Sequence, residues 1–466
     1  MLRYLILKYG LFIYVFVCFT LVVFLKFQQC VETNSELRAV SIAFIHSVYY
    51  YPTTQMQGSN ALALLLTIDH QNQDLPSTSR KFTLIASDGE KVSRTLVNFH
   101  MESMDSCQMT MTVARTNTIG NLRKLELETN GHRVQIPFKI GRYLIDKPVI
   151  MCSSPLVAAE NWQSFLISAH VANRYGGHLH LYISSVVEAY LQLIKKYEKE
   201  GFITADYWPK MTFQERLFVE TFEAAVRTDC LLQFRETAKF ITFFDLEDVL
   251  IPINHSSYLD EFTARFASEP DPETTSHVYY QQTGYQFSRA LPFSNFSFSG
   301  LKTIRQLSKV RSGHVVIRSI THPSSWVEQR RNDMIIDPKI KYQLLHHRLL
   351  SSGANEKSLR NFESFGQIIG GENLEKVEEQ FDRMKVLHNI SGSSLPESPT
   401  NSPILHDCHQ RFRHQNRQIC FDRDTCQLPI DQKCVVFGAE YSNGPFMYPV
   451  SFHFAKRILL TRDGEC

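Results

Sequence analysis

The chain has almost no excess charge of either sign. Its 466 residues include 49 lysines and arginines against 47 aspartates and glutamates, which gives a formal net charge of +2. Binding to a nucleic-acid backbone relies on a clear surplus of basic residues, so we expect no nucleic-acid partner. No internal repeat is visible either, so a solenoid of repeated units is not expected.

The cysteines lack the spacing of a metal site. None of the ten lies in a Cys-x-x-Cys pair or another compact zinc-binding pattern, so we expect no structural zinc. In an oxidising compartment disulfides are the default, and we predict disulfide bonds for the four cysteines from Cys408 to Cys434. An odd number of cysteines follows the apolar N-terminal run, and Cys30 is the candidate for a bridge between two copies of the chain. The pairing itself does not follow from the sequence.

One long apolar run stands near the start of the chain. Residues 9–25 carry no charge and would form roughly 26 Å of helix, close to the ~30 Å hydrocarbon layer of a bilayer. Arg3 and Lys8 precede the run and favour a cytoplasmic N-terminus. We predict a single-pass type II membrane protein, with a cytoplasmic tail at 1–8, a signal-anchor at 9–25 and a stem at 26–36. A cleaved signal peptide is the alternative, although the run is long for one.

Three Asn-x-Ser sequons agree with a lumenal location in the Golgi or the endoplasmic reticulum. The predicted glycosylation sites are Asn254, Asn295 and Asn389. Each sequon alone is a weak signal, because such triplets also arise by chance.

Two patterns divide the rest of the chain. Residues 37–145 alternate polar and apolar side chains between turn-forming residues, which predicts a mostly antiparallel β module. Residues 146–435 alternate strand and helix patterns, which predicts an α/β domain with a parallel sheet. Residues 436–466 form a C-terminal extension. The clearest elements are strands at 61–69, 81–87, 147–155, 178–184, 202–209 and 239–252 and helices at 162–177, 187–201 and 213–238.

The strand predicted at 239–252 carries three carboxylates. The apolar residues 240–244 are followed by Asp245, Glu247 and Asp248. Ligands of α/β sheets bind at the carboxyl ends of strands, and clustered carboxylates repel one another unless solvent, a cap or a cation compensates. A hard cation such as Mn²⁺ or Mg²⁺ accepts oxygen ligands and can bridge them to a diphosphate. The alternative, on spacing alone, is an acidic turn that caps the next element.

The segment 147–252 resembles the core of glycosyltransferase family 92, which is expanded in nematodes. The resemblance rests on the order of four stretches and on two later ones. They are VIMCSSPL (149–156), ENWQSFLISAHVANRYGGHLHLYI (160–183), LIKKYEKEGFITADYWPK (193–210), RTDCLLQFRETAKFITFFDLEDVLIP (227–252), VVIRS (315–319) and DPKIKYQLLHHRL (337–349).

The resemblance implies a GT-A-like, Rossmann-type domain that binds a nucleotide sugar. It also implies inverting transfer of a hexose, galactose from UDP-galactose, to a glycan acceptor, with Mn²⁺ held by an Asp-x-Asp motif at Asp245 and Glu247. The family usually shows Asp-x-Asp-Glu, whereas this chain has Asp245-Leu-Glu-Asp248. This departure leaves a catalytically inactive relative, which binds glycan or nucleotide sugar, as the alternative.

The resemblance also points to substrate and metal contacts outside the acidic turn. The family's His-Tyr-Arg becomes His346-His347-Arg348 here, so His346 would join the metal ligands and Arg348 would pair with phosphate. Asp229 and Trp208 are predicted to contact the donor. The alternatives are a core histidine for His346, a helix cap for Asp229 and a core anchor for Trp208.

The general base that an inverting transfer needs is not assigned by the sequence. Glu328 and Asp337 are candidates. A third reading, an adhesion or receptor module built on the β segment, leaves the α/β half without a role.

Overall fold

The fold is described from a computed structural model. It covers residues 41–53, 59–69, 81–98, 109–129, 132–142, 147–209, 212–213, 216–217, 219–244, 246, 248–252, 254–270, 277–287, 293–305, 313–318, 344–349, 362–390, 395–396, 433–443 and 450–465. Over these residues the chain forms a mixed α/β structure with four β-sheets.

The largest sheet has ten strands and contains the predicted strand–helix alternation. Its parallel half runs in the order β12-β10-β9-β15. These strands are β9 (Val149–Ser153), β10 (Gly177–Ile183), β12 (Ile203–Tyr207) and β15 (Phe240–Phe244). β9 is buried at every position, as expected for a parallel strand covered on both faces. The parallel sheet predicted from the sequence is confirmed.

The same sheet continues with antiparallel strands beyond β15. β19 pairs antiparallel with β15, and β17, β18 and β21 follow in that order. β20 joins β17 on one side and β16 on the other. These strands are β16 (Asp248–Leu250), β17 (His277–Phe287), β18 (Lys302–Arg305), β19 (Gly313–Arg318), β20 (Leu344–Leu349) and β21 (Phe362–Ser364).

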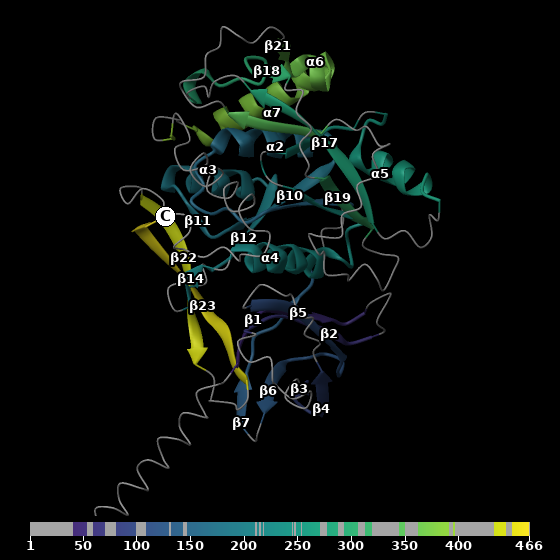
Figure 1. The fold of residues 1–466 in the computed structure, drawn as a ribbon, viewed down its shortest axis with the longest axis vertical. Helices are drawn as coiled ribbons and strands as arrows, with labels where there is room; N and C mark the ends of the chain where they lie inside the picture. Colours follow the sequence, from purple (N-terminus) through teal and green to yellow (C-terminus); the bar gives the residue numbers. More distant parts are fainter. Residues whose placement is uncertain are drawn as a thin grey trace, which may run out of the picture.

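α2 and α3 lie on one side of this sheet, and α4 lies on the other (Figure 1). Both α2 and α3 end as predicted: Gly176 follows α2 and Gly201 follows α3, each with a positive φ that suits glycine. The helices of the chain are α2 (Trp162–Arg174), α3 (Glu188–Lys199), α4 (Val219–Phe234), α5 (Tyr258–Ala267), α6 (Phe365–Ile369) and α7 (Gly371–His388), with a 3₁₀ turn η2 (Phe293–Asn295).

A seven-stranded sheet joins the two ends of the chain. Its order is β11-β22-β23-β1-β2-β5, with β8 paired to β1, and the β22–β23 hairpin runs down one side of the molecule (Figure 1, yellow). β22 crosses the boundary placed at 435/436, so the C-terminal extension belongs to this sheet. The strands are β1 (Ser41–Tyr51), β2 (Ala61–Asp69), β5 (Met109–Asn117), β8 (Lys139–Ile140), β11 (Ser185–Val186), β22 (Lys433–Asn443) and β23 (Val450–Glu465).

A four-stranded antiparallel sheet covers the outer face of the seven-stranded one. Leu64 of β2, Leu84 of β3 and Leu127 of β6 belong to the core between them, each no more than 1% exposed. The antiparallel β module predicted from the sequence is therefore confirmed, as a β-sandwich. The strands of the outer sheet are β3 (Lys81–Ser87), β4 (Val92–Asn98), β6 (Lys124–Thr129) and β7 (His132–Gln135).

α4 fills the space between the seven-stranded and the ten-stranded sheets (Figure 1). One buried cluster contains Leu65 of β2, Phe234 of α4 and Ile241 of β15. The apolar residues Ala225, Val226, Cys230, Leu231, Leu232 and Phe234 of α4 are all buried in it. The β module and the α/β domain therefore share a continuous core.

Two sequence predictions need correction in this region. The helix predicted at 213–238 begins only at Val219, because β13 (Thr212–Phe213) and β14 (Arg216–Leu217) form a short hairpin before it. The strand predicted at 239–252 is divided into β15 and β16 at the acidic turn.

No described helix is long and apolar enough to span a membrane. The predicted signal-anchor at 9–25, the stem and Cys30 lie outside the described residues.

Candidate active site

The strand order reverses at the carboxyl ends of β9 and β15, the position at which open α/β sheets are expected to form a ligand-binding crevice. From β9 the chain moves outward to β10 and β12, and then returns through α4 to β15 on the other side of β9. Ligands of open α/β sheets bind where the strand order reverses in this way. At this point Ser153, the last residue of β9, lies in register with Phe244, the last residue of β15.

Ser153 offers an unused polar group at this edge. The residue is 1% exposed, and within the described part of the chain its Oγ has no hydrogen-bond partner. Buried polar side-chain atoms are satisfied in the large majority of cases, so an exception calls for an explanation. A ligand bound at the carboxyl end of β9 would supply the missing partner.

The acidic turn begins directly after β15. Asp245 and Glu247 lie outside the described residues, whereas Leu246 between them is described and is 9% exposed. The carbonyl oxygen of Leu246 accepts a hydrogen bond of 2.8 Å from Oγ of Ser168 on α2. Asp248 is the first residue of β16, and its side chain is not among those described.

The pairing of β16 brings a distant predicted residue to the acidic turn. Asp248 of β16 lies in register with His346 of β20, and His346 lies in register with Gly284 of β17. Arg348, two residues further along β20, lies opposite Gln286 of β17. The structure therefore brings Asp248 and His346 onto neighbouring strands, although 98 positions separate their numbers in the sequence.

Comparison with known proteins decides the family. The sequence profile of glycosyltransferase family 92 matches residues 147–385, about half of the chain. The family 92 protein ZK381.2 of Caenorhabditis elegans is 35% identical over 93% of this chain and 91% of its own length. A second nematode family 92 protein, F55C10.4, is 31% identical and covers 98% of both chains.

The chain belongs to glycosyltransferase family 92. The resemblance found in the sequence is thereby confirmed, and the protein is a glycosyltransferase, for which the family implies a nucleotide-sugar donor and a glycan acceptor. Among solved structures, the bacterial heptosyltransferase TibC matches 34% of this chain and 34% of its own at 10% identity. Its TM-score of 0.11 is too low to support any argument.

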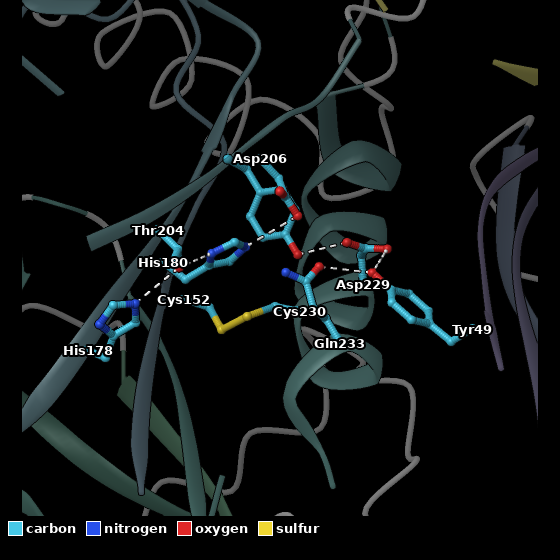
Figure 2. The surroundings of a disulfide bond; sticks show 10 residues. Tyr49, Cys152, His178, His180, Thr204, Asp206, Asp229, Cys230 and Gln233 are labelled. Atoms are coloured by element: carbon cyan, nitrogen blue, oxygen red, sulfur yellow. Dashed lines mark hydrogen bonds and ion pairs between the residues drawn. A yellow bond between two sulfur atoms is a disulfide. The ribbon is translucent and has the colours of Figure 1, made fainter. Parts of the chain in front are cut away.

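In this glycosyltransferase Asp229 is a buried residue of α4 that contacts tyrosines of β1 and β10. Its Oδ1 accepts a hydrogen bond of 3.1 Å from the Tyr49 hydroxyl, and its Oδ2 accepts one of 2.8 Å from the Tyr182 hydroxyl. Figure 2 shows Asp229 and Gln233 on α4 next to Tyr49. Burial is the main reason that the pKa of this carboxyl is raised above its ordinary value. Because Asp229 is 1% exposed, contact with a donor would require the network to open, and its donor role stays a prediction.

Trp208 of the glycosyltransferase also occupies a core position. Its ring stacks on His46 at a centroid distance of 5.3 Å and meets Tyr182 edge-on at 5.6 Å. The residue is 6% exposed, which matches the core anchor named as the alternative. Contact with a sugar or a base stays a prediction.

A polar group that the sequence did not suggest lies beside this core (Figure 2). Thr204 Oγ1 lies 3.2 Å from His178 Nε2 and 2.8 Å from His180 Nδ1, and His180 Nε2 lies 3.8 Å from Asp206 Oδ2. Burial lowers the pKa of His178 to about 4 and holds the pKa of His180 well below its ordinary value, so both rings are neutral at physiological pH. Over the described residues no group of three or more metal-binding side chains is present. The proposed ligands Asp245 and Glu247 fall outside this set.

The predicted glycosylation sites are accessible. Asn254, Asn295 and Asn389 are all exposed. Exposure is required for modification, but glycosylation itself stays a prediction.

The cysteines pair in a way that the sequence did not suggest. Cys152 of β9 and Cys230 of α4 form a disulfide, and both are buried. Cys434 is also disulfide-bonded, which agrees with the prediction for it. The predicted partners Cys408, Cys420 and Cys426 lie outside the described residues.

Proposed function

We propose that this family 92 glycosyltransferase transfers a hexose, galactose from UDP-galactose, to a glycan acceptor with inversion at the anomeric carbon. We further propose a GT-A-like fold and a requirement for Mn²⁺. The enzyme would act in the Golgi or the endoplasmic reticulum as a type II membrane protein, with residues 9–25 as its anchor. Cys30, close to that anchor, is the candidate for a bridge between two copies.

One observation carries the proposal: β16 and β20 bring Asp248 and His346 onto neighbouring strands, close in the sequence to the end of β15. β15 ends beside Ser153, the acidic turn follows at once, and β16 leads out of that turn next to β20, which carries His346. An acidic turn that only caps a strand would not account for a histidine and an arginine on the neighbouring strand, nor for the unpaired Ser153 hydroxyl.

The residue types of the acidic turn and of β20 would suit a divalent cation. Asp245 and Glu247 provide carboxylate oxygens, and His346 provides an imidazole nitrogen, a set that Mn²⁺ accepts. Bound there, the cation would offset the negative charge that develops on a departing diphosphate. The chain's own residues would assist, because Arg348 can pair with a phosphate and Ser153 can hydrogen-bond to the donor.

Inversion requires a base that removes the proton from the acceptor hydroxyl as its oxygen attacks the anomeric carbon. The acceptor oxygen gains the bond to the sugar, and the nucleoside diphosphate leaves with the electron pair of the broken bond. Glu328 and Asp337 remain the candidates for this base, and both lie outside the described residues.

The test is sugar transfer by the purified full-length chain, measured over a panel of nucleotide sugars with and without Mn²⁺. Asp245→Ala should reduce transfer by at least ~100-fold, because the loss of several kcal/mol of leaving-group stabilisation corresponds to about tenfold per 1.4 kcal/mol. Asp382→Ala, which removes an exposed carboxylate on α7, is the matched control and should retain activity. Full activity of Asp245→Ala would show that the acidic turn is only a turn.

The order of the acids in Asp245-Leu-Glu-Asp248 differs from the Asp-x-Asp-Glu that is usual in the family. This difference favours a second candidate function, that of a relative that binds glycan or nucleotide sugar without turnover. Glutamate is one methylene longer than aspartate, and a misplacement of about 1 Å can cost ~100-fold in rate. Glu247→Asp should preserve or raise activity in an active enzyme. Wild-type protein that binds UDP-sugars but does not transfer them would favour the binding relative.

A further inference from the structure

We infer that Ser168 is a positioning residue for the acidic turn, an inference that rests on the function proposed above. Its Oγ donates a hydrogen bond of 2.8 Å to the carbonyl oxygen of Leu246, the residue between the two proposed metal ligands. Serine in the interior of a helix often bonds to the carbonyl one turn earlier in its own helix. Here the hydroxyl instead reaches a residue 78 positions away in the sequence.

The carbonyl of Leu246 lies where the strand ladder is interrupted. β15 ends at Phe244 and β16 begins at Asp248, so Leu246 belongs to neither strand. A buried carbonyl outside a ladder needs a donor from elsewhere. The Leu246 side chain is buried in the same core as α2, so the turn is held by its side chain and by its backbone.

α2 holds Ser168 in a fixed position for this hydrogen bond. The helix is buried at every position from Trp162 to Ala172, and Asn161 caps its first turn by accepting a hydrogen bond from the Ser164 backbone. It is also the helix that follows β9, the strand that ends at Ser153. Ser168 therefore connects the β9 side of the crevice to the acidic turn on the β15 side. Asp245 and Glu247 are bonded covalently to Leu246, so a shift of its peptide moves both of them.

The same helix provides a matched control. Ser164 lies one turn before Ser168 and is equally buried, at 1% against 3% exposed. Its Oγ has no hydrogen-bond partner in the described part of the chain. Alanine at either position removes a buried hydroxyl from α2, but only at 168 does it release the acidic turn.

The experiment compares full-length Ser168→Ala and Ser164→Ala by Mn²⁺ titration of sugar transfer. Groups that orient metal ligands typically account for 10–100-fold in metal affinity or activity. We expect Ser168→Ala to raise the half-saturating Mn²⁺ concentration by roughly tenfold or more, with transfer partly restored at high Mn²⁺. Ser164→Ala should stay within about twofold of the wild type. A purely structural role would lower the thermal midpoint without changing the Mn²⁺ response, and equal Mn²⁺ curves for the two variants would overturn the inference.

Two further measurements cover the remaining outcomes. If Ser168→Ala does not fold, Ser168→Thr is tested in its place, because threonine keeps the hydroxyl. A Mn²⁺ response close to that of the wild type then supports the inference, and a weakened response refutes it. If the wild type transfers no sugar, direct Mn²⁺ binding is compared instead. Wild-type binding that Ser168→Ala weakens would reject only the proposed transfer. No wild-type binding, or binding that Ser168→Ala leaves unchanged, would reject the positioning role.

Discussion

Replacing Asp229 with alanine should destabilise the protein without any involvement of the acidic turn. The change removes the acceptor of the Tyr182 hydroxyl and one of the two acceptors of the Tyr49 hydroxyl, which also donates to Gln233 Oε1 at 2.9 Å. A buried donor left without a partner costs about 1–3 kcal/mol, and a lost hydrogen bond about 0.5–1.5 kcal/mol. We therefore expect a loss of about 2–4 kcal/mol at mildly acidic pH.

The titration of Asp229 also predicts the direction in which the stability of the wild type changes with pH. The folded-state pKa of Asp229 is raised, chiefly by burial, above its ordinary value of 3.8. Between these two pKa values the folded state holds a proton that the unfolded state has released, so the free energy of unfolding falls as pH rises. This contribution to stability is complete below 3.8 and is lost as pH passes the folded-state pKa. Asp229→Asn has no carboxyl that titrates at this position. Its free energy of unfolding should therefore increase relative to that of the wild type as pH rises.

The assay is thermal unfolding of the full-length protein over a pH series, with the disulfides intact. Asp229→Ala should lower the midpoint by several °C, whereas Asp229→Asn should stay close to the wild type, since an amide can still bond to a tyrosine hydroxyl. Asp382→Asn, an exposed carboxylate on α7, controls for the general loss of one negative charge. A midpoint for Asp229→Ala within about 1 °C of the wild type would refute the reasoning.

Two further outcomes test the topology and the role of the C-terminal hairpin. Single Asn→Gln changes at Asn254, Asn295 and Asn389 should each remove one glycosidase-sensitive step in gel mobility if this part of the chain is lumenal; no step for any of them would contradict the predicted topology. A stop after Gln432 should prevent folding, as judged by thermal unfolding and protease resistance. It removes Phe452 and Phe454 from the β-sandwich core, each worth about 1.5–3 kcal/mol of burial. A folded, protease-resistant truncation would show that the hairpin is dispensable.

The sequence predicted those elements whose boundaries are set locally. The strands at 61–69 and 81–87 match β2 and β3, because runs of apolar and alternating residues are bounded there by turn-forming residues. The end of α2 is marked by Gly176, since few other residues adopt its positive φ without strain. In these cases the deciding interactions lie within a few residues of one another.

Pairings between distant segments could not be predicted in this way. β23 lies beside β1 from the other end of the chain, and no local pattern in either strand names its partner. The same holds for the register that places His346 opposite Asp248, where a family resemblance, and not periodicity, had suggested a shared site.

Asp229 shows another limit of prediction from the sequence. A single aspartate in a helix has the same pattern whether it caps, binds a ligand or accepts bonds from buried tyrosines. The available signal was the apolar character of α4 on two sides, since a helix between two sheets has little solvent-facing surface for a polar side chain.

The contacts of α4 argue that the β module helps to set the geometry of the crevice. Tyr49 of β1 bonds to Asp229, the next residue Cys230 is joined to Cys152, and Cys152 precedes Ser153 at the carboxyl end of β9. A short path of hydrogen-bonded and covalent links thus runs from the module to the edge where we propose that the donor binds. Ser168 approaches the same edge from the opposite face of the sheet, through α2. A module that only spaced the α/β domain from a membrane would need no such path, so the β module is better regarded as part of the same folded unit as the proposed donor site.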